Sequence, residues 1–143
     1  MRTSIRLSSL VIACILLLAS SALASPADDT LKSLLAARQS LVTMLDTTDG
    51  AAQSKLQGEI AQHTKSVDAA VAAALADKAT SADAAAKFKE FKSIWDAFKK
   101  TRDGEIVPAI RAGKVDQAKA LAKGVQAERL AKMKDLLAAL GAK

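Results

Sequence analysis

Two runs of apolar residues on either side of a glycine limit the folds open to this chain more than any other feature. The apolar side chains recur every three or four positions, which places each run on one face of a helix. The first run contains Phe88, Phe91, Trp95, Phe98, Arg102, Ile106 and Ile110. The second contains Ala118, Leu121, Val125, Arg129, Met133, Leu136 and Leu140. The pattern predicts a hairpin of two long amphipathic helices that turns at Gly113, with one arginine inside each stripe.

The N-terminus has the three parts of an export signal. Arg2 and Arg6 provide positive charge, residues 7–18 are mostly apolar, and residues 22–24 read Ala-Leu-Ala, a small-residue cleavage site. We expect residues 1–24 to be a signal peptide that is cleaved after Ala24, which makes the mature chain periplasmic. An uncleaved membrane anchor is the less favoured alternative, because the apolar run approaches the roughly 18 residues of a membrane span.

The composition of the remaining chain points to one domain held together by its core. Cleavage would remove Cys14, the only cysteine, so no disulfide could form. Residues 11–14 resemble a lipid-attachment box, which leaves lipidation of Cys14 as an alternative. Loss of Arg2 and Arg6 reduces the 21 basic residues to 19, against 15 acidic ones, for a net charge of +4. This mild charge, without a basic face rich in aromatic residues, argues against a nucleic-acid partner.

Residues 25–143 read as helix throughout, and the first two helices have clear ends. Ser25 is a capping residue, and Pro26 lies in the first turn, where its missing N–H costs little. Residues 47–50 supply turn and cap chemistry, and the second helix is expected to run to about Asp77. The buried stripe expected for the first helix is Leu31, Leu34, Leu35, Arg38, Leu41, Val42 and Leu45. That of the second is Leu56, Ile60, His63, Val67, Ala70 and Ala74.

The third and fourth helices are less regular. Thr80 and Asp83 resemble a capping box for the third helix. The ring of Pro108 would clash with the carbonyl of Gly104, which predicts a kink there. The remaining helix ends are assigned to Gly113 closing the third helix, Asp116 capping the fourth and Gly141 closing it.

Short connections make consecutive helices antiparallel, so the chain predicts an all-α, up-down-up-down four-helix bundle over residues 25–143. One alternative is an elongated alanine-rich coiled coil that completes its core by oligomerising, but the turns interrupt the heptads that it needs. Another is an exported amphipathic protein that lies on membranes. Its helices would carry lysine-flanked aromatic residues, which these stripes lack.

The second hairpin resembles the four-helix-bundle sensor domains of methyl-accepting chemotaxis receptors. The shared pattern is aromatic, aromatic, arginine, apolar pair, glycine, acidic residue and alanine. Its residues here are Trp95, Phe98, Arg102, Ile106, Ile110, Gly113, Asp116 and Ala118. The resemblance covers about 25 residues well and the rest of the chain in its helical plan. It implies a sensory module. Since no membrane helix or signalling domain follows Lys143, it implies the sensor fold without its output.

The resemblance also implies a small anionic ligand and a homodimer. Members of the family bind amino acids or carboxylates, commonly at a dimer interface and through arginines. Arg102 matches a position of the motif, whereas Arg38 is a candidate from its helical position alone. A membrane receptor or another envelope protein is an alternative partner.

Counting helical residues outward from each turn places Arg38, His63, Trp95 and Arg129 near one layer of the bundle, with Arg102 about two turns away. One interpretation is an anion site in which Arg38 and Arg129 are forked donors for a carboxylate. Trp95 would then form a wall of this site, and His63 would add a hydrogen bond. The other interpretation, which we favour on residue pattern alone, is that the arginines extend to water or to neighbouring acids and that Trp95 is core.

Cofactor binding and catalysis find little support in the residues. His63 with Met133 is a conceivable axial pair for haem, but there is no second histidine and no Cys-x-x-Cys-His motif, so we expect no metal or cofactor. No nucleophile, base and acid arrangement and no phosphate-binding glycine loop is present, which argues against an enzyme. The leading hypothesis is an exported sensor-like ligand-binding module. A structural or chaperone-like envelope protein comes second, and a haem or metal carrier third.

Overall fold

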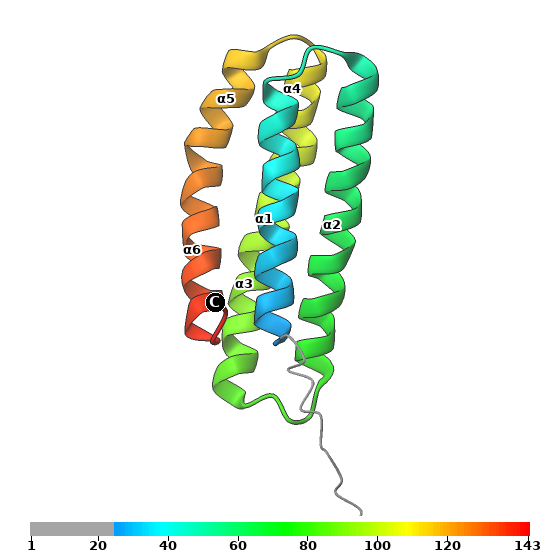
Figure 1. The fold of residues 1–143 in the computed structure, drawn as a ribbon. Helices are drawn as coiled ribbons and strands as arrows, with labels where there is room; N and C mark the ends of the chain where they lie inside the picture. The colour runs from blue at the N-terminus through cyan, green and yellow to red at the C-terminus, as the bar shows by residue number, and fades with distance from the viewer. Residues whose placement is uncertain (1–24) are drawn as a thin grey trace, which may run out of the picture.

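Residues 25–143 of the computed structural model form four antiparallel helical rods joined by short turns (Figure 1). The first two rods are α1 (Pro26–Leu45) and α2 (Gly50–Ala76). The third consists of α3 (Ala82–Thr101), the π-helical η1 (Arg102–Ile106) and α4 (Val107–Arg111), and the fourth of α5 (Val115–Lys123) and α6 (Val125–Ala139). The predicted all-α four-helix bundle is confirmed. The predicted signal peptide and Cys14 lie outside the described residues.

The ends of the first hairpin follow the sequence closely. The Ser25 hydroxyl accepts the backbone N–H of Asp28 at 3.1 Å, and the Asp28 carboxylate accepts the backbone N–H of Ser25 at 3.3 Å, which forms a capping box. Asp49 caps α2 by accepting the Ala52 N–H at 2.7 Å. The expected break between α1 and α2 and the end of α2 are confirmed.

Two predicted caps of the second hairpin are wrong. The residue that caps α3 is Ser81, whose hydroxyl accepts the Ala84 N–H, while the Thr80 hydroxyl donates back to the carbonyl of Ala74. The capping residue of α5 is Lys114, which makes no side-chain capping bond, and Asp116 lies in the first turn. Because Thr80 and Ser81 are adjacent hydroxyl residues, the sequence does not decide which of them starts the helix.

The irregularity expected before Pro108 occurs as a turn of π-helix. The Val107 N–H donates to the carbonyl of Arg102, five residues back, in the widened turn of η1. Such a turn changes the backbone pairing just ahead of a proline that has no N–H of its own. The third rod then ends at Gly113, whose φ of 73° confirms the predicted left-handed residue. Gly141, with a φ of 91°, likewise follows the end of α6.

The fourth helix is interrupted at Gly124, which the sequence analysis missed. Gly124 has φ −87° and ψ −113°, and its carbonyl accepts the N–H groups of Ala127 and Glu128 as the start of α6. The buried face nevertheless keeps helical spacing across the break, through Ala122, Gln126 and Met133. Val125, expected in the core, is 36% exposed, while Gln126 is 1% exposed.

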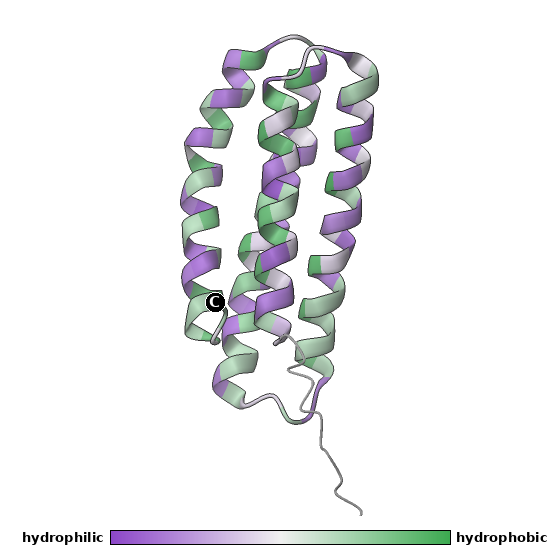
Figure 2. Ribbon diagram, in the orientation of Figure 1, coloured by the Kyte–Doolittle hydropathy of each residue, from purple (hydrophilic) through white to green (hydrophobic). Residues whose placement is uncertain are grey.

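The buried face of α1 also differs from the expected stripe. Leu35 is 41% exposed, whereas Ala37, Ser40 and Met44 are buried. The Ser40 hydroxyl donates to Glu59 of α2 at 3.2 Å. The small side chains of Ala37 and Ser40 lie on this face, and α1 packs more extensively on α2 than on α5 or α6. Along each helix, hydrophobic and hydrophilic residues alternate in short blocks, as expected for one buried face (Figure 2).

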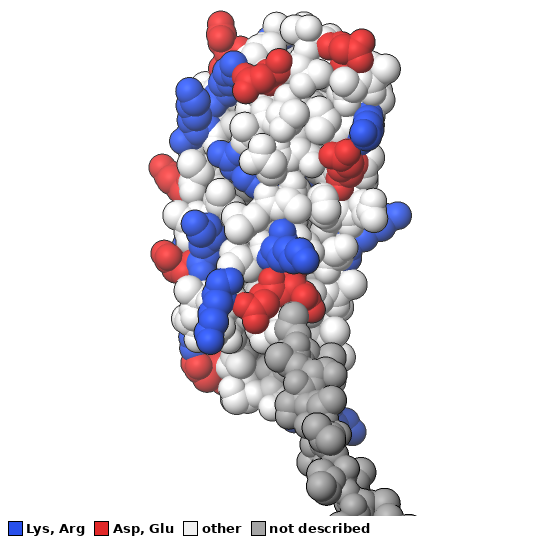
Figure 3. Space-filling model, in the orientation of Figure 1, with Lys and Arg blue, Asp and Glu red and all other residues white. Residues whose placement is uncertain are grey.

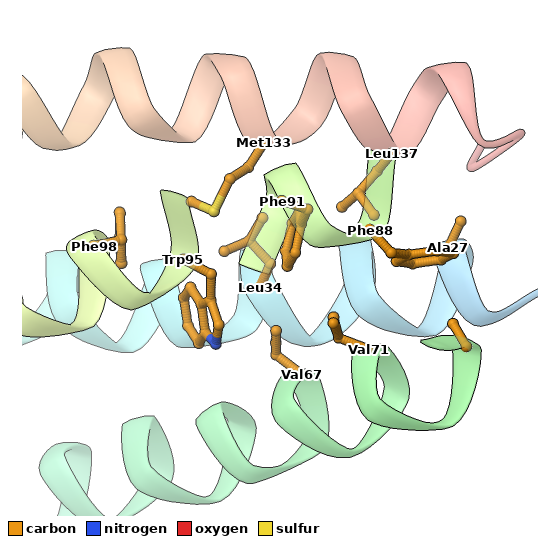
Figure 4. Close-up of a cluster of buried hydrophobic side chains, with 11 residues drawn as sticks. Ala27, Leu34, Val67, Val71, Phe88, Phe91, Trp95, Phe98, Met133 and Leu137 are labelled. Atoms are coloured by element: carbon orange, nitrogen blue, oxygen red, sulfur yellow. The ribbon is translucent and has the colours of Figure 1, made fainter. Parts of the chain in front are cut away.

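The interior contains two separate apolar clusters. The lower core, named for its place in Figure 1, lies toward the two chain ends of the described part, and Figure 4 shows Met133 reaching in from α6 toward the α3 aromatics. It comprises Ala27, Leu34, Val67, Val71, Ala74, Phe88, Phe91, Trp95, Phe98, Met133 and Leu137. The upper core comprises Leu41, Met44, Leu45, Ile60, Ile106, Val107, Ala109, Ile110, Ala118 and Ala122.

A polar layer separates the two cores. On α2 and on the third and fourth rods, its residues fall between the lower-core and the upper-core positions. The layer consists of Thr64, Thr101, Arg102, Gln126 and Arg129, of which Thr101, Arg102 and Gln126 are buried. Hydrogen bonds between rods satisfy these groups, and no buried side-chain nitrogen or oxygen of the described residues lacks a partner.

Candidate functional site

The five side chains predicted to surround a ligand point into different spaces. Trp95 and Arg102 lie together in the interior, with the guanidinium carbon 5.7 Å from the indole centroid. Arg129 reaches from α6 to α3. Arg38 lines a groove between α1 and α5, and His63 lines another between α1 and α2. The structure thus joins Trp95 with Arg102 and directs Arg38 and His63 away from each other.

The guanidinium of Arg102 is paired with groups of the protein itself. Its Nε and Nη2 donate to the two carboxylate oxygens of Asp103 at 2.7 and 2.9 Å, a bidentate pair. Its Nη1 donates to the Thr64 hydroxyl on α2 at 2.9 Å. With 3% of its surface exposed, Arg102 has no donor directed toward solvent for a ligand. Its geometry is that of a link between the third rod and α2.

Trp95 is a core residue with one polar edge. Its Nε1 donates to Asp68 of α2 at 2.8 Å, and its ring stacks on Phe98 with a centroid distance of 5.6 Å. The Lys99 ammonium lies 5.5 Å from the indole centroid and also binds Asp68, at 2.8 Å. Trp95 is 1% exposed, so it contributes little surface to the groove of about 250 Å³ that it lines with Asp68 and Lys99 between α2 and α3.

Two groups beside Trp95 have shifted pKa values. Burial lowers the pKa of Lys99, but its hydrogen bonds to Asp68 and Asp96 outweigh burial, so the pKa is raised. The hydrogen bond from Lys92 is the main reason that the pKa of Asp96 is lowered, with Lys99 adding to it. Both shifts favour the charged forms, so this cluster is an ion-pair network on the surface between α2 and α3.

Arg129 also binds protein groups. Its Nη1 lies 2.8 Å from the Thr101 hydroxyl and 3.2 Å from the carbonyl of Ala97, both on α3, and donates to the Gln126 side-chain oxygen at 3.2 Å. Gln126 in turn donates to the carbonyl of Phe98 at 2.9 Å. These two side chains hold α6 to the end of α3. Gln126 was not predicted as a site residue, although it lies four residues after Ala122 and three before Arg129 and so continues the buried face at helical spacing.

Arg38 lies in the groove that most resembles an anion site. This groove, of about 200 Å³, is lined by Arg38, Val42, Leu45, Asp46, Lys119, Ala122 and Lys123. Lys119 pairs with Asp46 at 2.9 Å. Among residues 25–143, no side chain or carbonyl accepts a hydrogen bond from Arg38. Basic side chains gather along the left of Figure 3, over α5, α6 and the adjacent part of α1, with acidic ones interspersed. The groove therefore combines an available guanidinium with lysines and apolar walls.

His63 lies in a wider groove of about 410 Å³ between α1 and α2. Its lining is polar or small, namely Asp29, Lys32, Ser33, Ala36, His63, Ser66 and Ala70. The balance of charge favours the Arg38 groove despite its smaller volume. The Arg38 groove holds one arginine and two lysines against one carboxylate, whereas the His63 groove holds one lysine against one carboxylate.

The predicted layer therefore does not form one pocket, because the side chains point in different directions around their helices. Counting residues from each turn gives the height of a side chain along the bundle and leaves its direction around the helix undetermined. Arg38 faces α5 and Arg129 faces α3, so the two guanidinium groups do not converge on one carboxylate. Lys119 and Lys123 were missed because their pattern on α5 is that of an ordinary solvated face.

Candidate metal ligands do not gather in this bundle. Among residues 25–143, no three histidine or carboxylate side chains are close enough to hold a metal ion. Met133 is buried in the lower core and Met44 in the upper core. His63 lines the outer groove between α1 and α2.

The comparison with protein families agrees with this architecture. The family described as "Four helix bundle sensory module for signal transduction" matches residues 27–142. Searches of the curated proteins and of the solved structures found no significant match. Within the described part of the chain, none of the helices has the length and hydropathy of a membrane span. A sensory family agrees with the expectation of a non-catalytic protein. The chain belongs to the family of four-helix-bundle sensory modules for signal transduction.

Proposed function

We propose that this sensory module binds a small anionic ligand in the groove between α1 and α5, with Arg38 as the main donor. The observation that carries the proposal is that Arg38, a half-buried residue in this groove, has no hydrogen-bond acceptor among residues 25–143, although Arg102 and Arg129 have theirs. A planar guanidinium matches a carboxylate with two parallel hydrogen bonds. A ligand carboxylate would give Arg38 the partner that the protein does not supply.

The rest of the groove supports a small ligand with an apolar part. Lys123 adds positive charge, and Lys119 is already paired with Asp46. Val42, Leu45 and Ala122 form apolar walls. The volume of about 200 Å³ is below the roughly 300 Å³ at which drug-sized pockets begin. A short carboxylate or an amino acid suits these dimensions better than a larger anion.

The other predicted site residues have supporting roles in this proposal. The hydrogen bonds of Trp95, Arg102 and Arg129 hold α2, the third rod and α6 together. His63 is kept as a candidate for a second, weaker contact site on the opposite side of α1.

A structural or chaperone-like envelope protein, which acts through exposed apolar surface, is the second candidate. It is less well supported, because Leu35 and Val125 are the large hydrophobic residues exposed in the described part of the chain, at 41% and 36%. Chaperone-like binding calls for a wide contiguous apolar patch, and two isolated residues are ordinary for a soluble domain.

The cellular setting of the proposal comes from the sequence and the family. We propose export to the periplasm with cleavage after Ala24, assembly as a homodimer, and either ligand sensing or docking on a membrane receptor. N-terminal sequencing of the exported protein tests the cleavage, and sedimentation equilibrium tests the dimer.

A thermal-shift screen of the purified protein against short carboxylates, amino acids and phosphates tests the binding. A ligand present at one hundred times its dissociation constant adds about 2.7 kcal/mol to the free energy of unfolding. The shift should disappear in Arg38→Met and persist in the control Arg111→Met. Arg111 also carries one positive charge, but it binds Gln57 and Ser54 on the exposed face of α2, outside the groove.

The Arg129→Met variant separates a ligand contact from a structural role. It should lower the melting temperature of the free protein, because Arg129 binds α3, and leave the ligand-induced shift intact. If no compound shifts the melting temperature, the ligand proposal fails and a protein partner becomes the better hypothesis. If Arg129→Met abolishes the shift while Arg38→Met does not, the groove between α1 and α5 is the wrong site.

A further inference from the structure

The two ends of the described chain meet at one carboxylate, that of Asp28 in the first turn of α1. Its Oδ2 accepts the backbone N–H of Ser25 at 3.3 Å and the Ser25 hydroxyl at 2.8 Å. Its Oδ1 accepts the backbone N–H of Lys143 at 2.8 Å. Both oxygens are therefore occupied, and one side chain bridges the start of α1 and the C-terminal residues at the lower end of the bundle (Figure 1).

The C-terminal residues are held in position for this contact. Gly141 has a φ of 91°, and the chain turns back so that the Ala142 N–H donates to the carbonyl of Leu137 at 3.0 Å. Leu140 and Ala142 pack against the lower core. The Lys143 N–H is thus presented to α1 by a tail that is itself anchored in the bundle.

The residues beside the Ser25 nitrogen carry more negative than positive charge. Asp29 follows Asp28 in the first turn of α1, and Asp77 at the end of α2 lines a pocket of about 340 Å³ together with Ser25. Among the residues that line this pocket, including those from α3, Asp77 is the one with a charged side chain. Lys143 contributes positive charge, but its coulombic effect on Asp28 ranks below the hydrogen bonds. Three carboxylates therefore outnumber one lysine here.

Asp28 is ionised at neutral pH. The hydrogen bond from the Lys143 N–H is the main reason that the pKa of Asp28 is lowered, and the bonds from the Ser25 hydroxyl and N–H add to it. An ammonium in the place of the Ser25 amide would add coulombic attraction between two ionised groups to the present hydrogen bond.

The proposed cleavage after Ala24 creates such an ammonium. Hydrolysis of the Ala24–Ser25 peptide bond consumes one water molecule and leaves a carboxylate on Ala24 and, at neutral pH, an ammonium on Ser25. We propose that the lower end of the bundle is a binding site for this mature N-terminal ammonium, in which Asp28 pairs with Ser25 and with the Lys143 N–H at once. We call this arrangement the clasp. It rests on the proposed cleavage and closes after it.

The clasp links export to the strength of the contact between the chain ends. Before cleavage, the Ser25 nitrogen offers Asp28 a single amide N–H, and after cleavage it offers a charged donor. The N-terminal end of a helix by itself disfavours a positive charge, so the carboxylates of Asp28, Asp29 and Asp77 are what holds the ammonium there. The two ends of the mature protein are therefore tied more firmly than those of the precursor.

Chemical labelling of the exported protein tests the clasp. N-terminal sequencing first establishes whether the chain starts at Ser25. The rate at which an acylating reagent labels the α-amine, followed by mass spectrometry of the N-terminal peptide from about pH 6 to about pH 10, then gives the pKa of that amine, which is ordinarily about 7.7–8.0. Asp28→Asn removes the charge and keeps the shape. At about pH 7 the wild-type amine should react about 2- to 10-fold more slowly than that of Asp28→Asn.

Two references make the result specific. Asp116→Asn makes the same change in the first turn of α5, at the upper end of the bundle, and should leave the pKa of the amine unchanged. Urea-unfolded wild-type protein needs no substitution and should show the ordinary pKa, below that of the folded protein. Equal pKa values in folded wild type, Asp28→Asn and unfolded protein would overturn the clasp and leave the cleavage standing. A chain that starts at another residue would refute the cleavage and the clasp together.

Discussion

The ion pair of Arg102 and Asp103 makes an asymmetric prediction about stability. The Arg102 side chain is 3% exposed, whereas that of Asp103 is 60% exposed. Removal of Asp103 leaves a buried guanidinium with only Thr64 as a hydrogen-bond partner. Removal of Arg102 leaves a carboxylate that water can solvate. The Thr64 hydroxyl still donates to the Ile60 carbonyl at 2.7 Å, so it is not orphaned either.

The expected changes in the free energy of unfolding follow from the different exposure of Arg102 and Asp103. Breaking a buried ion pair by removing one partner costs about 3–5 kcal/mol when the other charge stays buried. We expect Asp103→Ala to destabilise by about 3 kcal/mol, at the lower end, because Thr64 still binds one guanidinium nitrogen. Replacement of a buried charge by a well-packed apolar side chain is often neutral. Arg102→Met should therefore change the free energy of unfolding by less than about 1 kcal/mol.

Urea denaturation followed by far-UV circular dichroism measures both variants. This signal does not depend on Trp95, whose environment Arg102 contributes to. Glu90→Ala is the control, since the Lys132–Glu90 pair is exposed on both sides and 3.8 Å long, and should cost less than about 1 kcal/mol. A cost for Arg102→Met as large as that for Asp103→Ala would refute the argument. It would mean that the link from Arg102 to α2 stabilises the bundle in its own right.

Three further predictions concern the core, the turn and the pH dependence. Phe91→Ala should destabilise by about 3–5 kcal/mol in urea denaturation, because Phe91 is 0% exposed in the lower core. Gly113→Ala should destabilise by about 1–2 kcal/mol because φ is 73°, whereas Gly58→Ala in the interior of α2 should stabilise by about 0.5–1 kcal/mol, both measured by thermal denaturation. The pKa of Asp28 is lowered mainly by the Lys143 N–H and that of Asp96 mainly by Lys92. Their contribution to stability should thus be complete above about pH 4 and be lost as the pH falls through the lowered pKa values, a dependence that Asp28→Asn with Asp96→Asn should flatten in acid titrations. The pKa of Lys99 is raised, so its contribution should be complete below about pH 10 and be lost only as the pH rises through the raised value.

Much of the fold follows from the sequence because the signals are local. The stripe from Phe88 to Ile110 is buried as predicted, since aromatic residues at helical spacing leave one face for the core. Ser25, Gly113 and Pro108 act through their own backbone chemistry, so each marked a cap, a turn or an irregularity correctly. Thr80 was assigned a cap that Ser81 makes, because neighbouring hydroxyl residues compete on equal terms.

The candidate site was less predictable, because it depends on which neighbouring helix each side chain faces. The pattern placed Arg38 and Arg129 at similar heights, but the packing of α1 on α2 turns Arg38 toward α5, and Thr101 draws Arg129 toward α3. Lys119 and Lys123 line the groove only because α5 lies beside α1, and the spacing within one helix does not predict that neighbour.

The sequence by itself determined the helical class, the number of rods, most of their ends and the apolar stripe of the third rod. These depend on spacing and on residues that act within a few positions. Tertiary structure alone decided that the fourth rod breaks at Gly124, that Gln126 is buried between α6 and α3, and that two apolar cores are separated by a polar layer. It also decided that, among the arginines of residues 25–143, Arg38 is the one without a hydrogen-bond acceptor. Each of these outcomes depends on which groups from distant segments meet, and helical periodicity carries no information about rotation between neighbouring rods.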